Sequence, residues 1–205
     1  MARFIGFVFI VFCGLVMINY LFALAGHAFS GGGLAYLNQG SDQLASIDFS
    51  FFGKNGTGRS YITQGYGWTS FSYAYKGDRH DGIDIAVAYG APVYSPGDGT
   101  VFAVGNQDDY CFRRGFGKYV AVKDGTNHLI LWFVHLGTIA VSPGDTVKTG
   151  TLIGTVGTTG FETGTHLHFS IFNENGFSMT QRNGCGPDPT GRDLDPLSYL
   201  GTTYK

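Results

Sequence analysis

Hydrophobic and polar positions divide the chain into one long apolar block near the N-terminus and many short apolar runs from about residue 61 onward. The short runs are rich in Val, Ile, Thr, Tyr and Phe, and glycine-rich turn signals separate them. Such runs between tight turns are typical of β-strands. No stretch keeps an amphipathic helical period over three turns. The pattern therefore predicts an all-β domain, an antiparallel sheet or sandwich with small α content.

Five segments carry the strand pattern most clearly. They are GIDIAVAYG, PVYSPGDGTVFAVG, KYVAVKDGTNHLILWFVHL, DTVKTGTLIGTVG and THLHFSIFNENG, at residues 82–90, 92–105, 118–136, 145–157 and 165–176. Near the end of the chain, DPLSYL at residues 195–200 predicts a short turn or helix.

The N-terminal apolar block, residues 4–26, has Asn19 as its one strongly polar residue and follows Arg3. A membrane-spanning helix needs about 20 apolar residues, whereas the apolar core of a signal peptide has about 7–15. The length favours an uncleaved anchor, and Arg3 favours an N-terminus that stays in the cytoplasm. The sequences ALA at 23–25 and GHA at 26–28 resemble signal-peptidase sites and leave a cleaved signal open. Either alternative carries the rest of the chain across a membrane.

These patterns predict three segments. Residues 1–28 form a transmembrane anchor or signal segment with an apolar helix, residues 29–60 a linker or pro-like segment, and residues 61–205 the folded domain. Charged residues make up 14% of the 205 residues, the formal net charge is −2, and no basic patch stands out. Nucleic acid is therefore not an expected partner, whereas a membrane is, through residues 4–26.

Two of the three cysteines lie in polar loops of the expected domain. Cys111 occurs in DDYCFRR and Cys185 in RNGCGPD, whereas Cys13 lies in the apolar block. Because exported domains favour oxidised cysteines, we expect a disulfide bond between Cys111 and Cys185. Two free thiols are the alternative.

Two histidines lie one residue apart in GTHLHFSIF, residues 164–172. Side chains of a strand alternate between its two faces. His166 and His168 therefore share one face with Ser170, and the apolar residues between them share the other. Alone, this pattern is more typical of half-exposed strand histidines than of a functional site.

Other segments supply similar groups. His80 and Asp84 are four residues apart around Gly82, which argues against a helix, so they share one face of an extended chain. His135 ends the apolar run LILWFVHL. Four histidines and one aspartate thus lie on three strands. A catalytic zinc ion takes three protein ligands and keeps one position for water. The residues alone do not decide which three of the five are ligands.

The motifs that carry these residues resemble a known family. HDGID, the run HLGTIAVSPGDTVKTGTLIGTVGTTGFETGTHLHF and ITQGYGW are similar to the lysostaphin/LytM-type zinc peptidases, which cut peptidoglycan. The family pattern is H-x-x-x-D, then a lone His followed by Leu, then a glycine-punctuated run that ends in H-L-H-F. The likeness covers roughly residues 61–200.

The resemblance implies a role for each residue. His80, Asp84 and His168 match the zinc ligands, and His135 and His166 match the two catalytic histidines. It implies one Zn²⁺ per chain and a zinc metalloendopeptidase that uses zinc-activated water to cut stems or cross-bridges of peptidoglycan. The enzyme would act outside the cytoplasmic membrane, in the periplasm, the cell wall or a phage particle. Tyr66 and Trp68 are candidates for a substrate groove, although both fit a place in the core at least as well.

Two alternatives remain open at this point. A member of the same fold can be a non-catalytic binding or activating module, since a fold alone does not define a function. The enzyme can also be latent, with the segment before residue 60 covering the groove and Asn38 or Asn55 offering an amide oxygen to zinc.

Overall fold

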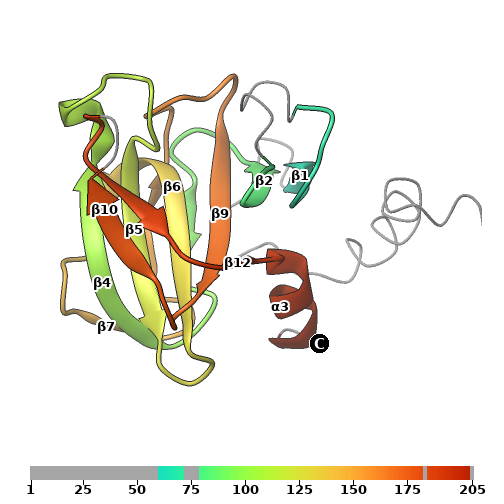
Figure 1. Ribbon diagram of the computed structural model, residues 1–205, viewed down its shortest axis with the longest axis vertical. Helices are drawn as coiled ribbons and strands as arrows, with labels where there is room; N and C mark the ends of the chain where they lie inside the picture. Colours follow the sequence, from blue (N-terminus) through green and yellow to red (C-terminus); the bar gives the residue numbers. More distant parts are fainter. Residues whose placement is uncertain (1–59, 72–78, 182–183, 204–205) are drawn as a thin grey trace, which may run out of the picture. The chain divides into compact units, whose positions relative to one another are not determined.

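The structure is a computed structural model that describes residues 60–71, 79–181 and 184–203. Within them, ten strands form one sheet in which every pairing is antiparallel (Figure 1). The strands are β1 (Tyr61–Gln64), β2 (Gly82–Ala86), β3 (Pro92–Tyr94), β4 (Gly99–Asn106), β5 (Lys118–Asp124), β6 (Leu129–Ile139), β7 (Thr146–Val147), β8 (Leu152–Val156), β9 (His166–Asn173) and β12 (Asp193–Leu194). The main path runs β1-β2-β9-β6-β5-β4-β7. The prediction of an antiparallel all-β domain is confirmed.

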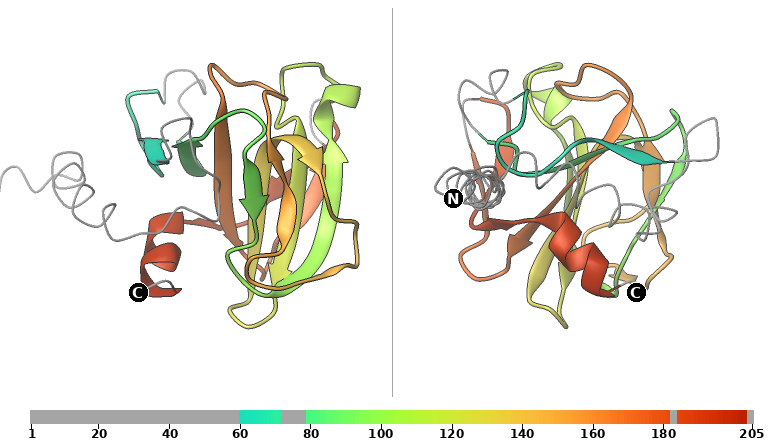
Figure 2. Two further views of the ribbon diagram at one scale, coloured as in Figure 1. Left: turned by 180° about the vertical axis from the view of Figure 1, so that it is seen from behind. Right: turned by 90° about the vertical axis from the view of Figure 1, so that its right-hand side faces the viewer.

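Smaller elements complete the described part of the chain. Strands β10 (Ser178–Gln181) and β11 (Pro187–Thr190) pair as a separate hairpin, which crosses the sheet in front of β4, β5 and β6 in Figure 1. Strands β3 and β8 pair with each other behind these strands (Figure 2). A 3₁₀ turn, η3 (Gln107–Asp109), follows β4, and an α-helix, α3 (Pro196–Thr203), ends the described chain.

The predicted N-terminal anchor or signal, residues 1–28, and the linker, residues 29–60, lie outside the described residues except for Ser60. In the part that is described, no helix is long and apolar enough to cross a membrane.

The core forms around β6, because its apolar residues alternate between the two faces of the sheet. On one face, Ile130, Trp132 and Val134 pack with Tyr119 and Phe172, and the partly buried Phe177 and Met179 cover them. On the other face, the Phe133 ring lies 5.1 Å from the Phe169 ring between centroids. Burying each such side chain stabilises the fold by about 1.5–3 kcal/mol. A strand that is apolar on both sides is thus fixed at the centre of the sheet.

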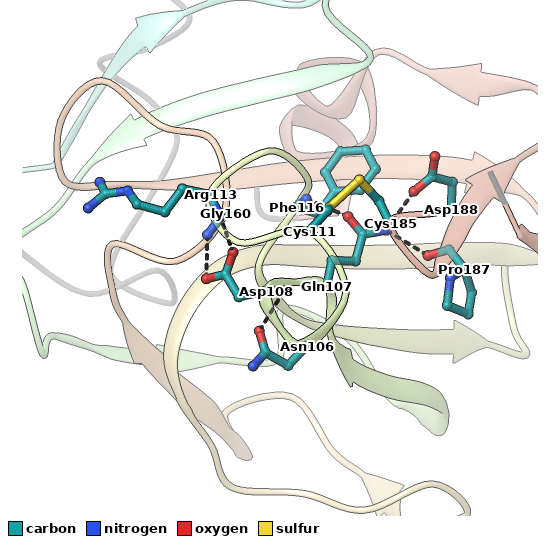
Figure 3. Close-up of a disulfide and its surroundings, with 10 residues drawn as sticks. All are labelled: Asn106, Gln107, Asp108, Cys111, Arg113, Phe116, Gly160, Cys185, Pro187 and Asp188. Atoms are coloured by element: carbon teal, nitrogen blue, oxygen red, sulfur yellow. Dashed lines mark hydrogen bonds between the residues drawn. A yellow bond between two sulfur atoms is a disulfide. The ribbon is translucent and has the colours of Figure 1, made fainter. Parts of the chain in front are cut away.

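The disulfide bond expected between Cys111 and Cys185 is present (Figure 3). Their Cα atoms are 4.8 Å apart, although 74 positions separate the two residues in sequence. The bond ties the segment after η3 to the loop that leads into β11. A loop of this length corresponds to about 4–5 kcal/mol of stabilisation in the simple chain-entropy model.

Helix α3 begins where the sequence predicts a turn or helix. Asp195 caps it, because its carboxylate accepts the backbone N–H of Leu197 at 3.0 Å. Pro196 follows as the first helical residue, where a missing N–H costs nothing. The helix then presents the Tyr199 hydroxyl to Asp124 at 2.7 Å.

Asp124 joins α3 to the β5–β6 turn. This buried carboxylate also accepts hydrogen bonds from the backbone of Thr126 and Asn127, at 2.9 and 3.1 Å, and from the Asn127 side chain at 2.8 Å. Burial alone would raise the pKa of Asp124, but the hydrogen bonds from Asn127 and Tyr199 outweigh it and lower that pKa. The folded state therefore favours the ionised form of Asp124 over its protonated form.

We expect Asp124→Asn to lower the free energy of unfolding at pH 7 by about 1.5–3 kcal/mol, the usual value of a hydrogen bond to a charged group. Because the folded pKa lies below the unfolded value of about 3.9, this contribution is complete above that value and disappears as pH falls through the folded pKa. Urea unfolding of the metal-free wild-type and Asp124→Asn proteins between pH 3 and 7 measures this contribution. Tyr199→Phe should also destabilise the protein, and Tyr89→Phe, at an exposed tyrosine, is its control. A difference between Asp124→Asn and wild type that stays constant with pH would contradict the assignment.

Candidate active site

The pairing of β2 with β9 brings together residues that are far apart in sequence. Its register places Asp84 opposite His168 and Ala86 opposite His166. Opposed residues of an antiparallel pair project from the same face of the sheet. His166, His168 and Asp84 therefore share one face, as the alternation along each strand predicts.

His80 precedes β2 and is held beside these residues by an isolated bridge. Its backbone N–H and carbonyl both bond to Gly67, each at 2.8 Å. The residue is buried, and its ring centroid lies 4.8 Å from that of His168.

Three donor atoms form a compact triangle. His80 Nε2 lies 3.0 Å from His168 Nδ1 and 3.2 Å from Asp84 Oδ1, and the last two atoms are 3.0 Å apart. Ligands at about 2.0–2.2 Å from a tetrahedral zinc ion are separated by roughly 3.3–3.6 Å. The triangle is thus slightly smaller than the set of three protein ligands in a catalytic zinc site, and a small outward movement would accommodate the ion.

The second nitrogen of each histidine ring has its own partner. His80 Nδ1 donates to the carbonyl of Gly65 at 2.8 Å, so Nε2 presents its lone pair to the triangle. His168 has the opposite orientation, with Nδ1 in the triangle and Nε2 at 2.7 Å from Ser170 Oγ. Outer partners of this kind fix the tautomer and orientation of metal-binding histidines.

Asp81 is a further carboxylate that the sequence analysis misses. Its Oδ1 lies 3.3 Å from His168 Nε2, and Asp81, His80 and His168 offer donor atoms within 4.8 Å of one another. Its position next to His80 is the only signal for it in the sequence. Asp81 contacts the outer nitrogen of His168, and its side chain is 34% exposed, compared with 10% for Asp84. The shorter distances make Asp84 the better third donor.

The charges of the cluster favour a cation. Burial alone would raise the pKa of Asp84, but its interactions with the His168 and His80 side chains outweigh it and hold that pKa far below its usual range. Burial would lower the pKa of His168, but hydrogen bonds to Asp81 and Asp84 raise it to about 10. Two ionised carboxylates thus hold a proton on a buried imidazole. A divalent ion can replace that proton, so the residues present fit zinc.

His135 reaches the same face through a β-bulge. Val134 lies opposite His168, so strict alternation would direct His135 to the other face of the sheet. However, the register with β5 shifts between Lys118 and Val120, where two residues of β6 oppose one of β5. His135 adopts a left-handed backbone conformation there, with φ 60°. Its ring centroid consequently lies 4.8 Å from that of His166.

His135 and His166 are oriented alike. Their Nδ1 atoms donate to the carbonyls of Thr159 and Gly164, at 2.7 and 2.6 Å, which leaves Nε2 of each ring as the acceptor. His166 Nε2 lies 3.5 Å from Asp84 Oδ1, at the edge of the triangle. Burial, together with the charges of His166 and His168, lowers the pKa of His135 to about 3. The His135 ring is therefore neutral at neutral pH.

The two aromatic residues proposed for a groove differ in their surroundings. The Arg79 guanidinium lies over the Tyr66 ring, 5.0 Å from its centroid, and the Tyr66 hydroxyl donates to the carbonyl of Asp193 at 3.2 Å. Trp68 is 72% exposed and follows Gly67, the residue that pairs with His80. Tyr66 therefore supports the local fold, whereas Trp68 offers an exposed ring beside the site.

Comparison with protein families agrees with this geometry. The model of peptidase family M23 matches residues 78–180, half of the chain. This range contains the triangle formed by His80, Asp84 and His168, and also His135 and His166.

Individual proteins are similar over parts of the chain. The glycyl-glycine endopeptidase ALE-1 of Staphylococcus capitis is 32% identical over 126 residues, 62% of this chain and 32% of that protein. The peptidoglycan DD-endopeptidase ShyA of Vibrio cholerae is 38% identical over 92 residues, 45% of this chain and 20% of that protein. The chain thus spans about a third or less of the length of these relatives.

A solved structure, a zinc-containing peptidase from Vibrio cholerae, shares the fold. Its TM-score is 0.53 at 27% sequence identity, over 74% of this chain and 39% of that chain. Together with the family match, these similarities confirm the resemblance that the sequence motifs predict.

Proposed function

Because the chain belongs to peptidase family M23, we propose that it is a zinc-dependent endopeptidase that hydrolyses peptide bonds in the stems or cross-bridges of peptidoglycan. The observation that carries the proposal is the triangle of donor atoms from His80, Asp84 and His168, with two further imidazoles beside it. Three ligands and two proton-handling groups are what metal-assisted hydrolysis requires.

His80, Asp84 and His168 would hold the ion through Nε2, Oδ1 and Nδ1. The chemistry supplied by bound zinc is Lewis-acid polarisation of the scissile carbonyl and a lowered pKa of water. His135 and His166 direct Nε2 toward the reacting groups, because Nδ1 of each is occupied by a backbone carbonyl. One imidazole accepts the proton of the attacking water. The other, in its imidazolium form, donates from Nε2 a hydrogen bond to the oxyanion or protonates the leaving amine.

The peptide would extend past the site along exposed aromatic side chains. Trp68 and Tyr66 are candidates for one side of the groove, and the 52%-exposed Phe161 lies in the loop before His166. The relatives suggest two bond classes, since ALE-1 is a glycyl-glycine endopeptidase and ShyA a peptidoglycan DD-endopeptidase. Both are amide bonds of peptidoglycan peptides, so the proposal covers stems and cross-bridges.

Digestion of purified peptidoglycans tests the function directly. We expect the protein that contains residues 61–205 to release new amine ends from at least one type of cross-bridge or stem, and mass spectrometry of the fragments identifies the bond. Chelation should abolish the release and added zinc should restore it. Metal analysis that finds no stoichiometric divalent ion, or digestion that survives chelation, would contradict the proposal.

The histidines should separate by role. His80→Ala, Asp84→Ala and His168→Ala should each lower zinc affinity together with activity, because each removes a ligand. His135→Ala and His166→Ala should keep zinc but lose about 10²–10⁴-fold in turnover, the usual cost of a general base or an oxyanion donor.

Asp81→Ala is the matched control for Asp84→Ala. It removes the neighbouring carboxylate and should retain one zinc ion per chain. Zinc lost from Asp81→Ala but kept by Asp84→Ala would reverse the assignment of the two carboxylates.

The domain would act outside the cytoplasmic membrane, with residues 4–26 as its membrane segment. The proposal rests on the length of the apolar run in the sequence. With an uncleaved anchor, the full-length protein keeps its N-terminus and stays with membranes after a carbonate wash. A soluble mature form that starts near Gly26 or Phe29 would instead reveal a cleaved signal.

A further inference from the structure

Residues 107–117, between β4 and β5, form a segment that we call the brace segment, and several bonds attach it to residues 185–188. Within this brace segment, Gln107 is 1% exposed, and its side-chain amide donates to the carbonyl of Pro187 at 2.8 Å and to Asp188 at 2.5 Å (Figure 3). Its amide oxygen accepts the backbone N–H of Phe116 at 2.6 Å. The Cys111–Cys185 bond adds a covalent tie to the same neighbouring loop. The brace segment therefore has a rigid attachment to the β10–β11 hairpin.

The other side of the brace segment contacts residues 157–162, the loop that leads toward β9. Asp108 bridges the two segments, because its Oδ1 accepts the N–H of Arg113 at 2.8 Å and its Oδ2 accepts the N–H of Gly160 at 3.0 Å (Figure 3). The N–H of Phe161 donates to the carbonyl of Gly115 at 2.7 Å. Arg113 pairs with Glu162 at 3.2 Å.

Two glycines allow the backbones to approach this closely. A Cβ atom on Gly117 would lie 2.3 Å from the carbonyl carbon of Thr159, and one on Gly160 would lie 2.3 Å from the carbonyl oxygen of Gly115. Both glycines also have positive φ, 65° and 74°. The contact is thus made by backbone against backbone and leaves no room for side chains.

His135 is held from both of these segments. Its backbone N–H donates to the carbonyl of Phe116 in the brace segment at 3.3 Å, and its ring Nδ1 donates to the carbonyl of Thr159 at 2.7 Å. A non-glycine residue at φ 60° is strained and persists only where its surroundings determine its conformation. The carbonyls of Phe116 and Thr159 hold His135 in this conformation. The distance between these two carbonyls depends on the contact between the brace segment and residues 157–162.

We propose that Asp108 is a positioning residue, which acts through Gly160 and Thr159 to orient the imidazole of His135. The inference rests on the proposed function, because it assumes that His135 takes part in the reaction. Asp108 touches neither the donor triangle nor the His135 ring. It sets the position of the carbonyl that accepts Nδ1–H, and hence the direction of Nε2. A displacement of about 1 Å at such a group can cost up to about 10²-fold in rate.

The test compares Asp108→Ala with Asp109→Ala in zinc-loaded protein, using soluble cross-linked peptidoglycan fragments as substrate. Asp109 belongs to the same turn and has the same charge, but it is exposed and accepts from Asn106. We expect Asp108→Ala to lower kcat by about 10-fold or more, with KM changed less than twofold and one zinc ion still bound. Asp108→Asn keeps one acceptor oxygen and should be intermediate, and it serves for the comparison if Asp108→Ala does not fold. Asp109→Ala should behave as wild type.

A measurement without substrate separates this inference from the proposed function. Nitrogen-15 NMR of the imidazoles should show His135 with a protected Nδ1 proton in wild type and Asp109→Ala. The Asp108→Ala protein should show faster exchange of that proton and a mixture of tautomers. If wild type cuts no peptidoglycan but the NMR difference is present, the proposed function fails and the positioning role of Asp108 stands. An unchanged Nδ1 signal with unchanged kcat in Asp108→Ala would overturn the inference, as would zinc loss in parallel with activity.

Discussion

The register between β2 and β9 is the constraint on which the site depends. Asp84 and His168 project from one face only because they oppose each other in this pair. A shift of one residue would turn every side chain of β9 over and place Leu167 and Phe169 where the imidazoles are. The buried apolar residues of β9 prevent that shift, since their exposure would cost several kcal/mol. The hydrophobic core therefore determines the position of the polar groups.

Much of this arrangement is predictable from local pattern. Alternation alone places His166, His168 and Ser170 on one face, and glycine-rich turns separate the strands where the structure has them. The family motifs single out the residues that the fold brings together. The position of His135 is different, because alternation from Val134 predicts the wrong face. A bulge with a left-handed histidine depends on the hydrogen bonds that His135 donates to the carbonyls of Phe116 and Thr159, and the sequence close to His135 does not reveal these partners. Asp81 escapes prediction for a similar reason, since it lies in a bend rather than a strand.

The cluster of charges at the site illustrates how stability and function oppose each other. Asp84 and His168 are nearly buried, and burial penalises each charged form. Their mutual hydrogen bonds offset the penalty only while both partners are present, so removing one leaves an uncompensated charge. The aromatic core beneath the β10–β11 hairpin occupies the same face of the sheet as the imidazoles, and the Phe116 ring lies 6.3 Å from that of His168 between centroids. A substitution in that core is consequently separated from the site by a single layer of side chains.

The place of β9 in the sheet affects when the site comes into existence. Strand β9 is among the later strands in sequence, yet it lies between β2 and β6. His80 and His168 are 88 positions apart, so their contact is among the most non-local in the domain. Until the chain has been synthesised past residue 173, β2 and β6 have no common neighbour, and the three groups of histidines lie on separate pieces of structure. A shortened or incompletely made chain therefore contains most of the individual functional residues without an assembled active site.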